Sequence, residues 1–150
     1  MFGLTMTRDP ETKSNYKSGK FTKTPKVLIV DDHEYNIMIV STYLENFGYE
    51  YDIAISGHEA LDLVYRHSYM AILMDIQMPL MDGLETTRHI REIEHTCNRE
   101  HQPIIALTAH PLSGDRESCD KVGMDGYISK PFNPETLRHI LNSFTGKEAV

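Results

Sequence analysis

Residues 70–83 read Met70-Ala-Ile-Leu-Met-Asp75-Ile-Gln-Met-Pro79-Leu-Met-Asp-Gly83, and this stretch decides the fold. An unbroken apolar run that is bounded by turn residues predicts a strand buried on both faces, as in a parallel sheet. Pro79 lacks an N–H donor and Gly83 favours a positive φ, so the strand ends near Asp75. Asp75 is therefore predicted at the carboxyl end of the strand, where open α/β sheets place their ligands. Taken alone, the residue is explained equally well as a helix cap.

The rest of the chain repeats this strand-and-helix pattern. Short apolar runs predict strands over 26–30, 50–55, 70–74, 103–107 and 126–129. Helical spacing, glycine stops and proline starts predict helices over about 34–47, 57–67, 84–95, 111–122 and 134–144, with a charged loop over 94–102. Strict alternation predicts a parallel sheet with helices on both faces, because each crossover must be right-handed.

Composition indicates a soluble protein of one domain. The chain has 150 residues, a net charge of −7 and two cysteines without metal-binding spacing. No apolar run approaches the roughly 20 residues that span a bilayer, so we expect no membrane insertion and a cytoplasmic location. The acidic balance argues against direct nucleic-acid binding. The eight histidines form no HxxxH or HExxH pair, so a histidine metal site is not expected.

Polar composition divides the chain into three parts. Residues 1–24 are polar and lysine-rich, and we interpret them as a flexible extension or linker. The alternating elements occupy residues 25–145, and residues 146–150 form a short tail.

Polar side chains follow four of the predicted strands. They are three carboxylates, a hydroxyl and an ammonium, contributed by Asp31, Asp32, Asp75, Thr108 and Lys130. Because the carboxyl ends of parallel strands meet at one edge of a sheet, we expect these groups to lie together. Crowded carboxylates require a compensating cation, and a hard divalent ion, Mg²⁺, suits a site of oxygen ligands. With Asp75 as nucleophile, Thr108 as hydrogen-bond donor and Lys130 as a positive charge, the set predicts phosphoryl transfer to a carboxylate.

The same residues lie in an ordered set of motifs. These are Val30-Asp31-Asp32, Met74-Asp75-Ile-Gln-Met-Pro79-Leu-Met-Asp82-Gly83, Leu107-Thr108-Ala109 and Gly126-Tyr127-Ile-Ser-Lys130-Pro131. Together they resemble the receiver domains of two-component response regulators, over about residues 25–145. The residues of these motifs are most similar to those of receivers attached to hybrid sensor histidine kinases. The resemblance implies a flavodoxin-like (βα)₅ doubly wound sheet with strand order 2-1-3-4-5.

The resemblance also implies a role for each matching residue. Asp75 corresponds to the phospho-acceptor, and Asp31 and Asp32, with the backbone carbonyl of Gln77, correspond to the Mg²⁺ ligands. Thr108 and Lys130 correspond to the phosphate-sensing pair. Three further correspondences are Tyr127 as the switch aromatic, Pro131 as a proline after a cis peptide, and Gln77 with His110 as side chains that tune acyl-phosphate lifetime. Gln77 and His110 are otherwise explained as solvated loop residues.

The family further implies partners and activity. A histidine kinase or a histidine phosphotransfer protein is expected to supply the phosphoryl group. Phosphorylation is expected to switch the face formed by the fourth helix, fifth strand and fifth helix, which can then pair with a second copy. Such a domain is not a dedicated enzyme, although it catalyses its own phosphorylation and slow dephosphorylation. The phosphodonor is expected to dock on the first helix, where helical phase places Ile37 and Met38 toward solvent.

Three alternatives remain open from the sequence. An aspartyl-phosphate phosphatase of the haloacid-dehalogenase type needs a second acid two residues after its nucleophile, where Gln77 lies. A flavodoxin-like FMN binder needs a Ser/Thr/Gly-rich phosphate loop in place of Asp31-Asp32. A docking scaffold of the same fold would not need the acidic set at all. The chain is either a single-domain regulator or a receiver from a hybrid kinase.

Overall fold

The computed structural model describes residues 26–109 and 114–146. The predicted extension over 1–24, most of the predicted tail and the predicted helix start at Pro111 lie outside the described residues. None of the described helices is long and apolar enough to cross a membrane. The described elements, in chain order, are β1 (Lys26–Val30), α2 (Glu34–Phe47), β2 (Glu50–Ala54), α3 (Gly57–Arg66), β3 (Ala71–Asp75), α4 (Gly83–Thr96), β4 (Ile104–Thr108), α5 (Gly114–Val122), β5 (Gly126–Ser129) and α6 (Pro134–Thr145).

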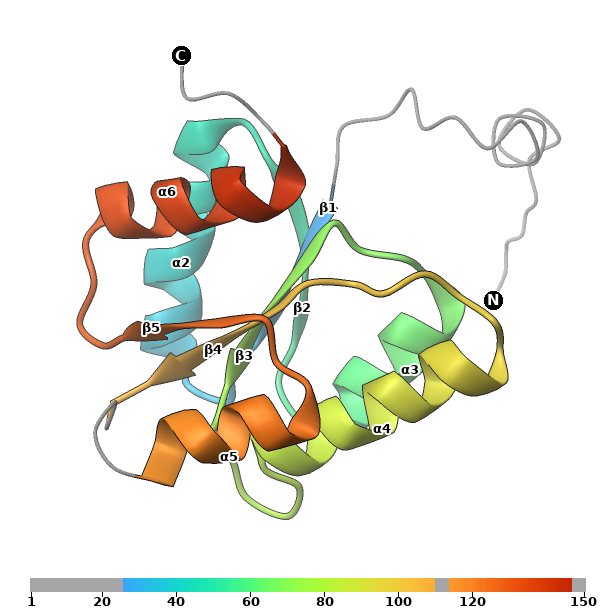
Figure 1. The fold of residues 1–150 in the computed structure, drawn as a ribbon. Coiled ribbons are helices and arrows are strands. Elements are labelled where there is room, and N and C mark those ends of the chain that lie inside the picture. Colours follow the sequence, from blue (N-terminus) through green and yellow to red (C-terminus); the bar gives the residue numbers. More distant parts are fainter. Residues whose placement is uncertain (1–25, 110–113, 147–150) are drawn as a thin grey trace, which may run out of the picture.

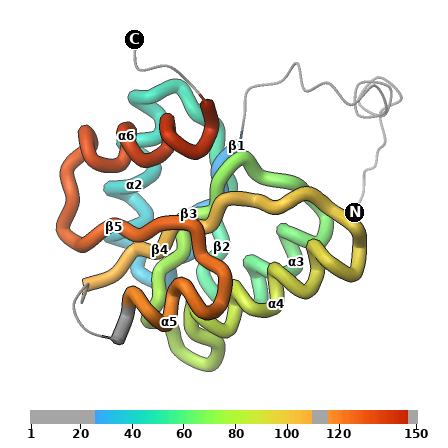
Figure 2. The backbone as a smooth tube through the Cα atoms, in the orientation of Figure 1, coloured from blue at the N-terminus to red at the C-terminus, as the bar shows by residue number. Residues whose placement is uncertain are grey.

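The strands form one sheet in the order β2-β1-β3-β4-β5, and all neighbouring pairs are parallel. The helices α2 and α6 cover one face, and α3, α4 and α5 cover the other (Figure 1). The backbone trace shows the same two layers of helices on either side of the strands (Figure 2). The predicted doubly wound fold and its strand order are confirmed.

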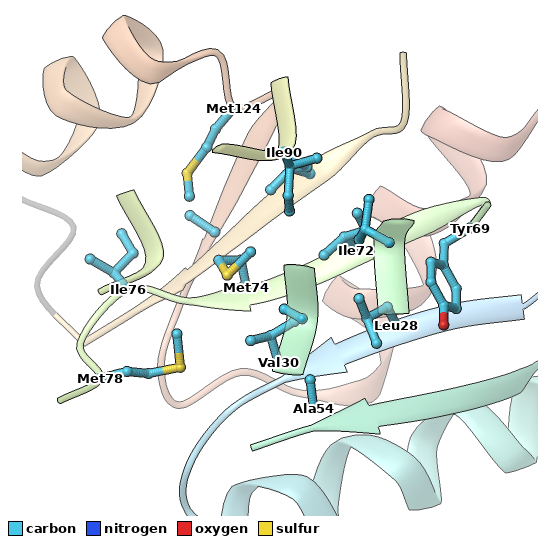
Figure 3. Packing of buried hydrophobic residues seen from close by; sticks show 14 of the residues in the cluster. Leu28, Val30, Ala54, Tyr69, Ile72, Met74, Ile76, Met78, Ile90 and Met124 are labelled. Atoms are coloured by element: carbon cyan, nitrogen blue, oxygen red, sulfur yellow. The ribbon is translucent and has the colours of Figure 1, made fainter. Parts of the chain in front are cut away.

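Both faces of the central strands are buried, so their side chains alternate between two cores. Leu28 and Ile72 lie in the cluster against α3, α4 and α5, part of which is drawn in Figure 3. Ile29 and Leu73 point to the opposite face, where they join a second cluster with residues of α2 and α6. This double burial explains why the strands are continuous apolar runs in the sequence.

The helix ends are satisfied mainly by local hydrogen bonds. Three N-cap side chains accept a hydrogen bond from a backbone N–H three residues later, and these are Ser56, Asp82 and Asn133. Gly48 ends α2 in the left-handed conformation, with φ of 88°, as its glycine predicts.

Gly83 corrects one expectation about the β3–α4 loop. It is not among the described glycines with positive φ, so it does not serve as a left-handed turn residue. Its N–H donates to the carbonyl oxygen of Ile76 at 2.7 Å. A Cβ atom at position 83 would lie 2.3 Å from the backbone oxygen of Asp75. The glycine is required because two backbone segments approach closely there.

The predicted loop over 94–102 is wrong at its start, because α4 continues to Thr96. Glu94 is a buried helical residue whose carboxylate accepts hydrogen bonds from Arg91 at 2.7 Å and from the Gln102 N–H at 2.8 Å. Arg91 also pairs with Asp125 at 2.8 Å. A buried ion network therefore replaces the apolar contacts that would have marked this turn as helical.

Candidate functional site

Four strands deliver the predicted polar groups to one edge of the sheet. Asp31 and Asp32 follow β1 directly, and Asp75 is the last residue of β3. Thr108 is the buried last residue of β4, and Lys130 follows β5. Because β1 pairs with β3, β3 with β4 and β4 with β5, the parallel register brings these strand ends together. The residues therefore converge as the sequence predicted.

The Lys130 ammonium lies between two buried carboxylates. Its Nζ atom donates to Asp75 Oδ1 at 3.0 Å and lies 3.6 Å from Asp31 Oδ2. The residue Asp75 is 5% exposed and Asp31 is 1% exposed. The Lys130 backbone N–H donates to the Thr108 carbonyl at 2.7 Å, which holds this lysine at the end of β4. The Lys130–Pro131 peptide is cis, as the resemblance implied.

Among the described residues, Lys130 is the one lysine paired with two of the three crowded carboxylates of the pocket. Burial raises the pKa of Asp75 above its ordinary value of 3.8, and the neighbouring Asp31 charge raises it further. The hydrogen bond and positive charge of Lys130 oppose this rise only in part. Ionised Asp75 is therefore less favourable in the folded protein than in solvent, and further positive charge nearby would offset this difference.

The side chains present fit a divalent cation. Asp31, Asp32, His33 and Asp75 offer ligand atoms that all lie within 4.8 Å of one another. Two buried oxygens, Asp31 Oδ2 and Asp32 Oδ1, accept no hydrogen bond. Unpaired buried carboxylate oxygens are unfavourable in a folded protein, and a cation satisfies them.

The remaining predicted site residues lie around this pocket or outside the described chain. The Gln77 side chain is exposed in the loop after Asp75. Tyr127 is half-buried in β5, with the Arg116 guanidinium carbon 4.5 Å from its ring centroid. His110 lies outside the described residues.

The predicted Ile37–Met38 surface needs a correction. Ile37 is half-buried and packs against the core that lies between the sheet and the helices α2 and α6. It lies three residues before Val40, on the same face of the helix. Met38 is 56% exposed, as expected, and Tyr35 is 69% exposed one turn earlier. The exposed apolar pair on α2 is therefore Tyr35 with Met38.

Two features near the pocket were missed from the sequence. His33 follows the acidic pair directly, and this adjacency was the available signal. A groove of about 480 Å³ lies beside the pocket, lined by Tyr35, Ile39 and Tyr43 of α2 and by Lys130, Pro131 and Phe132. The groove depends on a long-range approach of α2 to the β5–α6 connection, which no local motif indicates.

Comparison with known proteins agrees with this architecture. Residues 27–142 match the response regulator receiver domain family. The sensor protein GacS of Pseudomonas syringae pv. syringae is 38% identical over 125 residues, which are 83% of this chain and 14% of GacS. The chain thus spans only a small part of that relative.

Two solved structures extend the comparison. One is the receiver domain of the sensor histidine kinase PA1611 from Pseudomonas aeruginosa PAO1, which has a magnesium ion in its active-site cleft. It is 38% identical to this chain with a TM-score of 0.75, and the match covers 83% of this chain and 100% of that chain. The receiver domain of Saccharomyces cerevisiae Ssk1, crystallised with the histidine phosphotransfer protein Ypd1, is 27% identical with a TM-score of 0.78, covering 87% of this chain and 95% of that chain. This chain belongs to the response regulator receiver domain family of two-component systems.

The raised pKa of Asp75 predicts a stabilising substitution. A carboxyl whose folded pKa exceeds its unfolded pKa binds protons more tightly when folded, so stability falls as pH rises from 3.8 through the raised pKa. Asp75→Asn is therefore expected to raise the free energy of unfolding of the metal-free protein at about pH 7, by an amount that shrinks toward about pH 4. Urea denaturation with a chelator measures both effects.

Asp62→Asn provides the control, because Asp62 is exposed on α3 and its substitution removes the same charge. It should show no comparable gain at neutral pH. A less stable Asp75→Asn protein at about pH 7 would contradict the account of the crowded pocket.

Proposed function

We propose that this chain accepts a phosphoryl group from a phosphohistidine onto Asp75, in a Mg²⁺-dependent step of a two-component phosphorelay. The supporting observation is a buried carboxylate that ends the central strand β3, with the Lys130 ammonium 3.0 Å away and the acidic pair beside it. A structural salt bridge alone does not account for the two buried oxygens of Asp31 and Asp32 that accept no hydrogen bond.

The transfer needs little chemistry from the protein beyond positioning and charge neutralisation. An Asp75 carboxylate oxygen attacks phosphorus, and the phosphorus–nitrogen bond of the phosphohistidine breaks with its electron pair left on the imidazole nitrogen. Lys130 exchanges part of its pairing with Asp75 for the oxygens of the incoming group. Its position between Asp75 and Asp31 keeps the ammonium beside the acyl phosphate after transfer.

Mg²⁺ would be held by Asp31, Asp32 and Asp75, together with the backbone carbonyl of Gln77. When bound, the ion neutralises charge on the phosphoryl oxygens. The buried carboxylate oxygens that accept no hydrogen bond support this ligand set, and so does the similarity to the PA1611 receiver, which holds magnesium in its cleft. The exposed side chain of Gln77, two residues after Asp75, would tune the lifetime of the acyl phosphate.

Thr108 and Tyr127 would convert phosphorylation into a surface change. Thr108 is buried at the end of β4, one sheet position from Asp75. Movement of its hydroxyl toward the phosphoryl group would free space for the Tyr127 ring, which packs against the core beneath α5. The ring would then leave Arg116, a contact worth about 0.5–1 kcal/mol at an exposed position. The α5–β5–α6 face would change with it and become available to a second copy.

The phosphodonor would dock where α2 borders the groove. Tyr35 and Met38 present apolar area on this helix, and Tyr35 also lines the groove that Lys130 shares. A helical protein seated there would bring its histidine to the pocket of Asp75. Ssk1, a similar receiver, was crystallised with a histidine phosphotransfer protein, which supports a partner of this class.

Phosphorylation of Asp75 is tested with acetyl phosphate and Mg²⁺. Intact mass spectrometry should show one added phosphoryl group on the wild-type chain and none on Asp75→Asn. Asp82→Asn is the matched control, because it changes an exposed acid in the same loop and keeps an N-cap side chain for α4. Unchanged labelling of Asp75→Asn would move the acceptor elsewhere, and an unlabelled wild-type chain would favour the docking-scaffold alternative.

The docking surface is tested by Met38→Asp. Because the charge falls in an apolar contact, transfer from a phosphorylated histidine phosphotransfer protein should slow at least about tenfold, equivalent to about 1.4 kcal/mol. Labelling by acetyl phosphate should stay near the wild-type rate, since that donor needs no docking. Tyr65→Asp, at an exposed apolar position on α3 of the opposite face, should leave both rates unchanged. Wild-type transfer by Met38→Asp would place the docking surface elsewhere.

The switch is tested with beryllofluoride, a phosphoryl mimic, and NMR. The wild-type chain should show chemical-shift changes around Asp75 and also across β5 and α6. Tyr127→Ala should keep the changes around Asp75 and lose most of those in α6, because the ring carries the coupling. If the distant changes persist in Tyr127→Ala, Tyr127 is not the coupling residue.

A further inference from the structure

His33 occupies the N-cap of α2 without serving as a cap. Its backbone is extended, with φ of −106° and ψ of 118°, yet its side chain makes no capping hydrogen bond. The other N-caps with described side-chain bonds are Ser56, Asp82 and Asn133, residue types that accept from the first turn. The helix end therefore gives no reason for an imidazole at this position.

The imidazole lies against the acidic pair instead. Its Nδ1 atom is 3.1 Å from Asp32 Oδ1 and 3.6 Å from Asp31 Oδ1. The His33 backbone N–H donates to the same Asp31 oxygen at 2.9 Å, which holds the residue beside that carboxylate. The His33 side chain is otherwise largely open to solvent, so the ring is accessible to an ion entering from outside.

The separations of the His33 nitrogen from the two carboxylates lie in the range of ligands on one metal ion. Neighbouring ligand atoms of an octahedral ion with bonds of about 2.1 Å lie about 3 Å apart, and opposite ligand atoms lie about 4.2 Å apart. The His33 nitrogen stands 3.1 Å and 3.6 Å from the two carboxylates, and all four ligand atoms, with Asp75 included, lie within 4.8 Å.

A second observation points to a cation at this place. Asp31 is 1% exposed, yet its Oδ2 atom accepts no hydrogen bond, and the same holds for the buried Asp32 Oδ1 atom next to the His33 ring. Lys130 lies 3.6 Å from Asp31 Oδ2, beyond a good hydrogen bond. Each carboxylate of the acidic pair thus keeps one buried oxygen that accepts no hydrogen bond and could bind an ion shared with His33.

We propose that His33 supplies a nitrogen ligand to the divalent cation of this pocket and thereby shifts its preference from Mg²⁺ toward first-row transition metals. The inference rests on the proposed function, because it concerns the same cation site. Imidazole favours ions such as Co²⁺, Ni²⁺ and Zn²⁺, whereas carboxylate, carbonyl and water ligands suit Mg²⁺. The consequence is that Co²⁺ binds through one ligand which Mg²⁺ does not need.

The test compares Co²⁺ and Mg²⁺ binding by calorimetry in the wild-type chain and in two variants. His33→Gln keeps a polar side chain with an amide oxygen but removes the ring nitrogen. His58→Gln is the control, because His58 is an exposed histidine at the start of α3 that is not part of the acidic cluster. Thermal unfolding verifies that both variants are folded.

His33→Gln is expected to lower Co²⁺ affinity at least about tenfold, equivalent to about 1.4 kcal/mol, and to change Mg²⁺ affinity less than about twofold. His58→Gln should change neither affinity. In NMR spectra of the Co²⁺ complex, a strongly shifted imidazole N–H signal should be present in the wild-type chain and absent in His33→Gln. Mg²⁺ in excess should remove that signal, because both ions use the same pocket.

The proposal is overturned if His33→Gln lowers both affinities alike, lowers neither, or retains the shifted signal. Its failure is distinguishable from failure of the proposed function, because Asp75 labelling by acetyl phosphate with Mg²⁺ requires no His33 nitrogen. Normal labelling with an unchanged ratio of Co²⁺ to Mg²⁺ affinity would remove only the role of His33.

Discussion

Carboxylates crowded at the end of a buried sheet are the constraint around which this molecule is built. Lys130 is the only described ammonium within ion-pair distance of Asp31 and Asp75, at 3.6 Å and 3.0 Å. Losing it would leave buried negative charge uncompensated, which is more costly than the net contribution of the ion pairs themselves. Lys130 therefore links the end of β5 to the carboxylates after β1 and at the end of β3, while the pocket as a whole remains in need of further positive charge.

The two hydrophobic cores on either side of the sheet bring the charged residues of the pocket into one place. Val27 and Ile29 of β1 face α2 and α6, and Leu28 and Val30 face the other helices, so the strand cannot slip without exposing a full set of apolar side chains. With every neighbour parallel, the strand ends are aligned by packing far from the pocket. Hydrophobic burial thus supplies the free energy that holds like charges close together.

The elements and the central residues of the site could be predicted from the sequence, because continuous apolar runs and the polar residues after them are local signals. The phase of α2 was harder, since helical spacing predicted Ile37 toward solvent and only the packing shows that it contacts the core. Glu94 was misread because its partners, Arg91 and Gln102, satisfy a charge that looks solvated in the sequence. The position of the His33 ring depends on side-chain geometry, which spacing rules for metal-binding histidines do not describe.

Because of the close contact at Gly83, the base of the β3–α4 loop tolerates substitution less than its tip does. At its base, the Gly83 N–H binds the Ile76 oxygen at 2.7 Å, and no side chain fits against the Asp75 backbone. At its tip, Leu80 is 97% exposed, so its side chain is not constrained by packing. The loop can therefore change its outward side chains without moving the Asp75 backbone, so the surface around the pocket can diverge while its carboxylates stay in place.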